Sequence, residues 1–140
     1  MPASLSDIFT ALTPVCAAVQ GVVQVYTFTP EAPPVDGGVV FLSPEWTMEM
    51  IPIGNQTVTW KIKIAHVFKR TKADTDLERV SPLVINWLSA LSAIPNISLN
   101  NTAFLMYPES GDIELYTHSG QSYIAIVHRI LVMTTYPIIQ

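Results

Sequence analysis

Residues 56–70 read QTVTWKIKIAHVFKR, and the predicted fold is built around this stretch. Apolar residues alternate here with polar ones, and side chains in a β-strand point alternately to opposite faces of the sheet. The run predicts a long strand with one apolar face and one mixed, cationic face. It exceeds the usual length of about five to six residues, so we expect a hairpin arm or a strand that reaches beyond its own core. The apolar face consists of Val58, Trp60, Ile62, Ile64, His66 and Phe68.

A charged segment follows this strand directly. Residues 71–79, TKADTDLER, are almost entirely polar, and residues 69–79 hold four cations and three acids. Outside residues 61–79 the only cation is Arg129, whereas eight acids lie there. Residues 69–79 are therefore expected to form either a solvated hairpin tip or a flexible docking loop that steers a charged partner. The candidate contact residues are Lys69, Arg70, Lys72, Asp74, Asp76, Glu78 and Arg79.

The N-terminal segment predicts an amphipathic helix. Ser4 followed by Asp7 is an acidic variant of the capping box that starts a helix, and apolar residues then recur at helical spacing. Pro14 should kink or divide this helix, and Gly21 is a plausible stop at its end.

The remaining elements are assigned from the same rules. A second helix is expected from the pair Ser81–Pro82, with proline in the first helical position, to about residue 93. PESGD, residues 108–112, is expected to be a hairpin turn, and Gly120 marks another turn. The last strand is apolar on both faces, which places it at the centre of the sheet. The predicted strands are residues 22–29, 39–42, 47–53, 56–70, 104–107, 113–118 and 122–136.

This order of elements predicts a single α+β domain over residues 1–140, with two packed amphipathic helices on a mostly antiparallel sheet. The apolar face of the long strand should be buried against the second helix. The contacts expected there join Trp60, Ile62, Ile64 and Phe68 to Leu83, Trp87 and Leu91.

Composition narrows the classes of function. Only 13% of the 140 residues are charged, about half the usual share, yet no apolar run reaches the ~18 residues of a membrane helix. A surface with so few charges favours assembly with other chains. The net charge of −4 argues against nucleic-acid readout, and one cysteine excludes an internal disulfide.

No motif for catalysis, a metal or a cofactor stands out. The histidines His66, His118 and His128 lack the spacing of a zinc site, and we expect His66 and His128 to be hydrogen-bonded histidines of the core or half-buried ones. Cys16 lies on the apolar stripe of the first helix and is expected in the core. Two alternatives remain open: a small enzyme in which His66 or His128 meets an acid, and a ligand-binding or scaffold domain with a closed apolar cavity.

The order and texture of the elements resemble a known family. Four segments follow one another across nearly the whole chain: SLSDIFTALTPVCAAVQGVVQVY, TVTWKIKIAHVF, VSPLVINWLSAL and YIAIVHRILVMTTY. This series is similar to the tail terminator and head–tail joining proteins of long-tailed bacteriophages. The resemblance implies a non-enzymatic virion protein of the tail or neck, assembled in the host cytoplasm. It also implies a homo-oligomeric ring, a hexamer, that caps the tail tube and joins it to the head connector.

Under this resemblance the charged segment would face the tail tube protein or a neighbouring subunit. The low charge content and the apolar tail predict that subunits contact each other head to tail. We expect the interface at the apolar tail, with Tyr136, Ile138 and Ile139, or at the short strands near Phe41.

Overall fold

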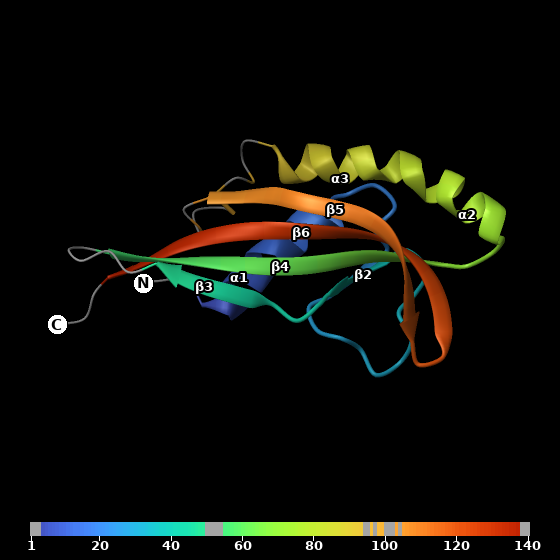
Figure 1. Ribbon diagram of the computed structural model, residues 1–140, viewed down its shortest axis with the longest axis horizontal. Helices are drawn as coiled ribbons and strands as arrows, with labels where there is room; N and C mark the ends of the chain where they lie inside the picture. The colour runs from blue at the N-terminus through green and yellow to red at the C-terminus, as the bar shows by residue number, and fades with distance from the viewer. Residues whose placement is uncertain are drawn as a thin grey trace.

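The computed structural model describes residues 4–49, 55–93, 96, 98–99, 103 and 105–137, with the backbone alone for residues 55, 73, 74 and 135–137. Within these ranges six strands form one mixed sheet with helices packed on it, which confirms the predicted α+β fold (Figure 1). The helices are α1 (Leu5–Ala17), α2 (Ala73–Val80) and α3 (Val84–Leu91), with a 3₁₀ turn at Ser81–Leu83. The strands are β1 (Gln24–Tyr26), β2 (Gly38–Phe41), β3 (Glu45–Glu49), β4 (Asn55–Lys69), β5 (Leu105–His118) and β6 (Gln121–Pro137).

The sheet has the strand order β1-β2-β4-β6-β5, and β3 pairs with β4 alongside β2. The pair β1–β2 is parallel, whereas the other pairs are antiparallel. The predicted long strand is β4, and it pairs with β6 from Asn55↔Pro137 to Lys69↔Tyr123. β6 therefore lies between β4 and β5, which confirms its predicted central position.

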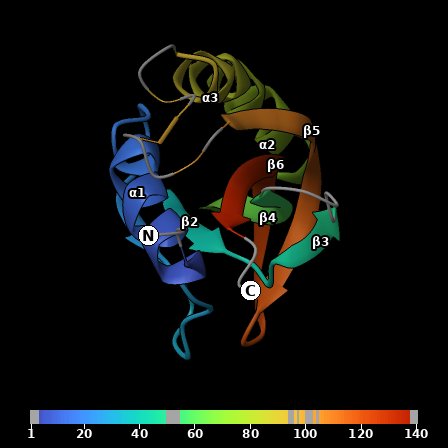
Figure 2. The ribbon, with the colours of Figure 1, turned by 90° about the vertical axis from the view of Figure 1, so that its left-hand side faces the viewer.

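The helices cover one face of this sheet (Figure 2). The large core cluster joins side chains of α1 and α3 to the β4 residues Ile62, Ile64 and Phe68. Trp60 is half-buried and packs against the same cluster. The opposite face holds a smaller cluster that includes Ala65 and Val67, so the face of β4 predicted as mixed and cationic is partly buried as well.

The start of α1 follows the prediction. The Ser4 backbone N–H donates to Asp7 Oδ2 at 2.9 Å, and the Asp7 N–H donates to Ser4 Oγ at 3.2 Å. Pro14 lies inside α1 without dividing it. The helix ends at Ala17, before Gly21, and the following strand covers only Gln24–Tyr26 of the predicted residues 22–29.

The prediction of a hairpin turn at PESGD is wrong. These residues lie within β5, and the register with β6 shifts between Pro108 and Ser110. β5 is an edge strand, where a proline without an N–H and a bulge are both tolerated. The turn predicted at Gly120 is confirmed: Ser119 and Gly120, with φ of 50° and 78°, join β5 directly to β6.

The second helix begins earlier than the Ser81–Pro82 pair predicts. α2 starts at Ala73, inside the segment expected to be a loop, and Ser81–Leu83 forms the 3₁₀ turn that connects it to α3. Asp76, Val80, Trp87 and Leu91 are all buried and recur at helical spacing through both helices. Because Asp76 is charged, a search for apolar residues at helical spacing does not include it, and the buried stripe is not recognised in the sequence.

Candidate functional site

Two buried histidines meet one tryptophan beneath α3. His66 on β4 and Trp87 on α3 are both 0% exposed, and Trp87 Nε1 donates to His66 Nδ1 at 3.0 Å. Because Nδ1 accepts this bond, the proton of the neutral imidazole lies on Nε2. Nε2 is 3.1 Å from the Gly37 carbonyl oxygen and 3.2 Å from that of Gly21. His66 is therefore a fully hydrogen-bonded core histidine, as predicted.

Gly21 and Gly37 belong to this arrangement for a conformational reason. Their φ angles are 96° and 83°, a region that favours glycine. A Cβ on Gly37 would also lie 2.9 Å from the Gly21 carbonyl oxygen. Gly21, expected as a helix stop, therefore contributes one of the two carbonyl groups that hold His66.

His128 on β6 differs from His66 in its hydrogen bonding. It is 3% exposed, its ring centroid lies 5.4 Å from that of Trp87, and its Nε2 has no hydrogen-bond partner among the described residues. Burial, together with a smaller effect of the nearby His66, lowers the pKa of His128 to about 4. The imidazole is therefore neutral at pH 7, with one nitrogen able to accept a hydrogen bond.

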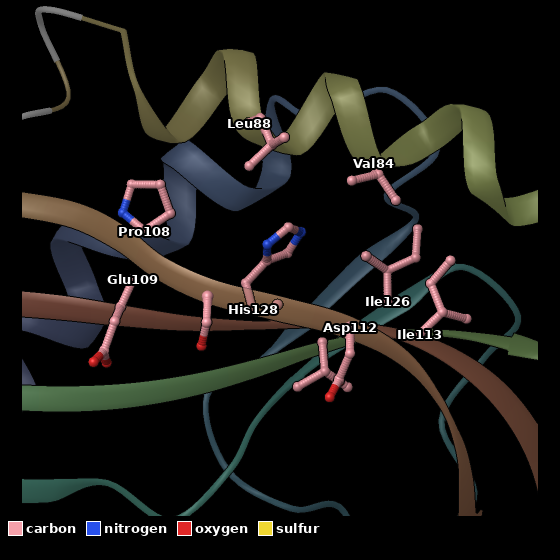
Figure 3. A pocket seen from close by; sticks show the side chains of 11 residues that line it. Val84, Leu88, Pro108, Glu109, Asp112, Ile113, Ile126 and His128 are labelled. Carbon is pink, nitrogen blue, oxygen red and sulfur yellow. The ribbon is translucent and has the colours of Figure 1, made fainter.

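His128 lines a pocket of about 380 Å³ between α3 and strands β5 and β6. This volume lies at the lower end of the ~300–1,000 Å³ typical of small-molecule sites. In Figure 3 the imidazole rises toward α3, beneath Leu88 and Val84. Much of the lining is apolar: Val84, Leu88, Pro108, Ile113, Ile126 and Val127.

Gly111 is paired with His128 and leaves room for its ring. A Cβ at Gly111 would lie 2.7 Å from the Val127 carbonyl oxygen and 3.2 Å from His128 Nδ1. A larger residue would therefore displace either the backbone of β6 or the imidazole. This glycine, expected to form a turn, instead makes the floor of the pocket possible.

Two carboxylates line the same pocket without facing the imidazole. Figure 3 shows the carboxylates of Glu109 and Asp112 directed away from His128. Asp112 lies 3.5 Å from the Arg129 guanidinium. The pocket therefore does not form the histidine–acid pair on which the small-enzyme alternative depends.

The other candidates for chemistry are placed as follows. Cys16 is fully buried in α1, and burial raises the pKa of its thiol to about 12, so the reactive thiolate is disfavoured. Within the described part of the chain, no three His, Cys, Asp or Glu side chains gather as metal ligands. His118 is half-buried near the tip of the β5–β6 hairpin.

The predicted docking loop, residues 69–79, is organised around Asp76. This carboxylate is 1% exposed. Its Oδ1 accepts from Thr71 Oγ1 at 2.9 Å, Thr71 N at 3.2 Å, Arg79 Nη2 at 3.3 Å and Lys72 N at 3.4 Å. Its Oδ2 accepts from Arg70 Nε at 3.1 Å. The segment expected to be a solvated hairpin tip or a flexible loop instead folds into α2 from Ala73 onward. Hydrogen bonds compensate the burial of the Asp76 carboxylate.

The network reassigns the candidate contact residues. Asp76, Arg70 and Arg79 hold the segment together. Lys69, Lys72 and Glu78 have exposed side chains and are available to a partner. The side chain of Asp74 lies outside the described residues.

Replacing Asp76 by asparagine should lower the melting temperature. Burial alone would raise the pKa of Asp76, but hydrogen bonds from Thr71, Arg70 and Lys72 outweigh it and lower the pKa to about 2. The charged carboxylate therefore contributes its full share of the folding stability above pH 3.8, the ordinary pKa of an aspartate. This share is lost as the pH falls toward 2. Glu78→Gln, an exposed change on the same helix, is the matched control for thermal unfolding at pH 7. Equal melting temperatures for the two variants would contradict the role given to Asp76.

The predicted interface residue Phe41 belongs to the core instead. It is 2% exposed, and its ring contacts that of Phe9 at 5.1 Å. Ile138 and Ile139 lie outside the described residues. The backbone of Tyr136, in β6, pairs with Gln56 of β4, and its side chain lies outside the described residues.

Strand β3 presents the exposed apolar groups that the sequence did not single out. Its five residues are all exposed, including Trp46 at 63% and Met48 at 54%. Trp46 contacts Trp60 across the β3–β4 pair, with ring centroids 6.0 Å apart. The alternation of polar and apolar residues in EWTME indicates a strand. Two apolar residues do not reveal whether other elements cover their face of the sheet.

No protein-family model and no curated protein matches this chain. Among the described residues, no helix combines the length and apolar character needed to cross a membrane.

Proposed function

We propose that this protein is a non-enzymatic structural subunit that closes into a ring through head-to-tail contacts. The observation that carries the proposal is β3, an edge strand exposed along its whole length with Trp46 and Met48 uncovered. Edge strands of this kind offer unpaired backbone groups and apolar area to another chain.

The two edges of the sheet differ, which supports a contact between unlike surfaces. β3 lies at one edge, and β5 is the outermost described strand at the opposite edge. β5 has 14 residues whereas β3 has five, so the two edge strands differ in length. Contacts between unlike patches generate rings when the rotation between subunits closes.

The resemblance to phage tail terminators gives this ring its proposed role. It would be a hexamer in the virion tail or neck, assembled in the host cytoplasm, that caps the tail tube and meets the head connector. Lys69, Lys72 and Glu78, exposed beside the Asp76 network, would then contact the tube protein. A ligand-binding or scaffold domain is the alternative that the pocket at His128 keeps open.

The mass in solution tests the proposal. Light scattering and native mass spectrometry should give a single species of six times the chain mass of 15.4 kDa. Increasing the salt concentration should leave an interface centred on apolar side chains largely intact, since salt weakens mainly exposed charge pairs. A single monomeric species at high protein concentration would contradict the ring.

A further inference from the structure

The pocket at His128 contains a hydrogen-bond acceptor without a donor. The imidazole is neutral, so one of its two nitrogens is an acceptor. Nε2 is fully buried without a partner among the described residues. The nitrogen that a group in the pocket can reach is therefore Nδ1, which lies beside Gly111 and accepts from no described residue. Buried polar groups in proteins are normally hydrogen-bonded, and an unpaired one is costly. The pocket is therefore suited to an apolar group that carries one N–H or O–H donor.

Trp46 on β3 has the complementary properties. Its side chain is 63% exposed and contacts the neighbouring Trp60 ring. Its indole N–H donates to no described residue, whereas the N–H groups of Trp60 and Trp87 donate to Thr134 and His66. An exposed indole with a free donor is a typical centre of a protein–protein contact.

The sheet places Trp46 and the pocket on the same face at opposite edges. Trp46 pairs with Trp60, Trp60 with Val132, and Val132 with Met106. Directly paired residues share a face of the sheet, so Trp46 lies on the face that the helices cover. Alternation along β6 puts His128 on this face too, four residues before Val132. The pocket lies beside β5, at the edge opposite β3.

We propose that Trp46 of one subunit inserts into the pocket of the next subunit and donates its indole N–H to the His128 imidazole. This inference rests on the proposed ring and names its contact. The donor and the acceptor lie on opposite edges of one chain, so each subunit uses both and the contact repeats head to tail. Val84 and Leu88 on α3 and Ile113 on β5 would then enclose the indole.

Single substitutions test the contact at its two ends. Trp46→Ala removes the inserted group, and Leu88→Trp fills the pocket from its own chain, because Leu88 lines the pocket and is 39% exposed. Each change should raise the dissociation constant of the ring by about 30-fold or more, the effect of a strong interface residue. Trp46→Phe, which keeps a ring but loses the N–H, should weaken association by about tenfold or less.

Met48→Ala is the matched control, since Met48 is exposed on the same face of the same strand. It should weaken association much less than Trp46→Ala, and both variants should keep the melting temperature that the wild type has at concentrations where it is monomeric. In a mixture of the two variants, the Trp46→Ala subunit keeps its pocket open and the Leu88→Trp subunit keeps its Trp46. This mixture should form one-to-one dimers that cannot grow, whereas either variant alone should be monomeric.

The pocket can also be tested without a ring, with 3-methylindole as the probe and the Trp46→Ala protein as the receptor. Imidazole NMR signals of His128 should shift on titration, and those of His66, which is already hydrogen-bonded, should not. A shift of His128 in a wild-type protein that stays monomeric would support the contact chemistry and overturn the ring. Rings that persist in Trp46→Ala with an unchanged dissociation constant would overturn the contact and leave the ring standing. No shift of His128 would also overturn the contact.

Discussion

Replacing Trp87 by alanine is expected to lower the free energy of unfolding by about 3–5 kcal/mol, the range for emptying a large buried aromatic site. Trp87 is 0% exposed and lies against the imidazoles of both His66 and His128. Its removal therefore leaves a cavity at the centre of the contact between α3 and the sheet. Chemical denaturation at pH 7 measures the loss.

Ile85→Ala is the control on the same helix, because Ile85 is 62% exposed. Exposed substitutions usually change stability by less than about 0.5 kcal/mol. Trp87→Phe separates packing from hydrogen bonding, since it keeps an aromatic ring but leaves His66 Nδ1 without a donor. We expect a loss of about 1–3 kcal/mol from that unpaired nitrogen. A loss below about 1 kcal/mol for Trp87→Ala would show that α3 does not depend on this side chain.

Stability should also fall as the pH decreases from about 6.5 to about 4. The folded protein holds His128 neutral with a pKa of about 4, whereas the unfolded chain protonates at the ordinary value of 6.5. The unfolded state therefore binds more protons in this window, so stability is complete above pH 6.5 and decreases below it. The difference corresponds to about 3 kcal/mol for His128. Burial lowers the pKa of His66 as well, which acts in the same direction.

Urea unfolding at pH 7.0, 5.5 and 4.5 measures this dependence. His128→Phe is the informative variant, because it keeps a ring in the pocket and removes the group that titrates. Its stability should depend less steeply on pH than that of the wild type, since one buried histidine remains. Parallel profiles for the two proteins would show that His128 is protonated equally in the folded and unfolded states.

Local physics made several features predictable from sequence. Alternation in residues 56–70 identified β4 because successive side chains of a strand point to opposite faces. Ser4 and Asp7 marked the start of α1 because each satisfies a free N–H of the other. Residues 122–136 are apolar on both faces of an extended chain, which indicated an interior strand, and β6 lies between β4 and β5.

Other predictions failed where distant parts of the chain outweighed local preference. PESGD contains residues typical of turns, yet pairing with β6 keeps it extended within β5. Residues 71–79 have the composition of a solvated loop. Donors from both sides of Asp76 nevertheless stabilise its buried carboxylate and the helix around it. Hydrogen bonds of this kind are specified by geometry, which composition does not report.

Sequence patterns alone thus identified the long strands β4 and β6, the face of β4 that meets the helices, and the core positions of His66 and Cys16. They did not reveal that His66, Trp87 and His128 meet, or that Trp46 and the pocket lie at opposite edges of one face; these depend on the tertiary fold. The physical reason is register: a period of two assigns a side chain to a face, but pairing with a neighbouring strand decides what lies beside it. His128 lies opposite Gly111 and Ile64 through such pairing, and no spacing along the chain encodes those partners.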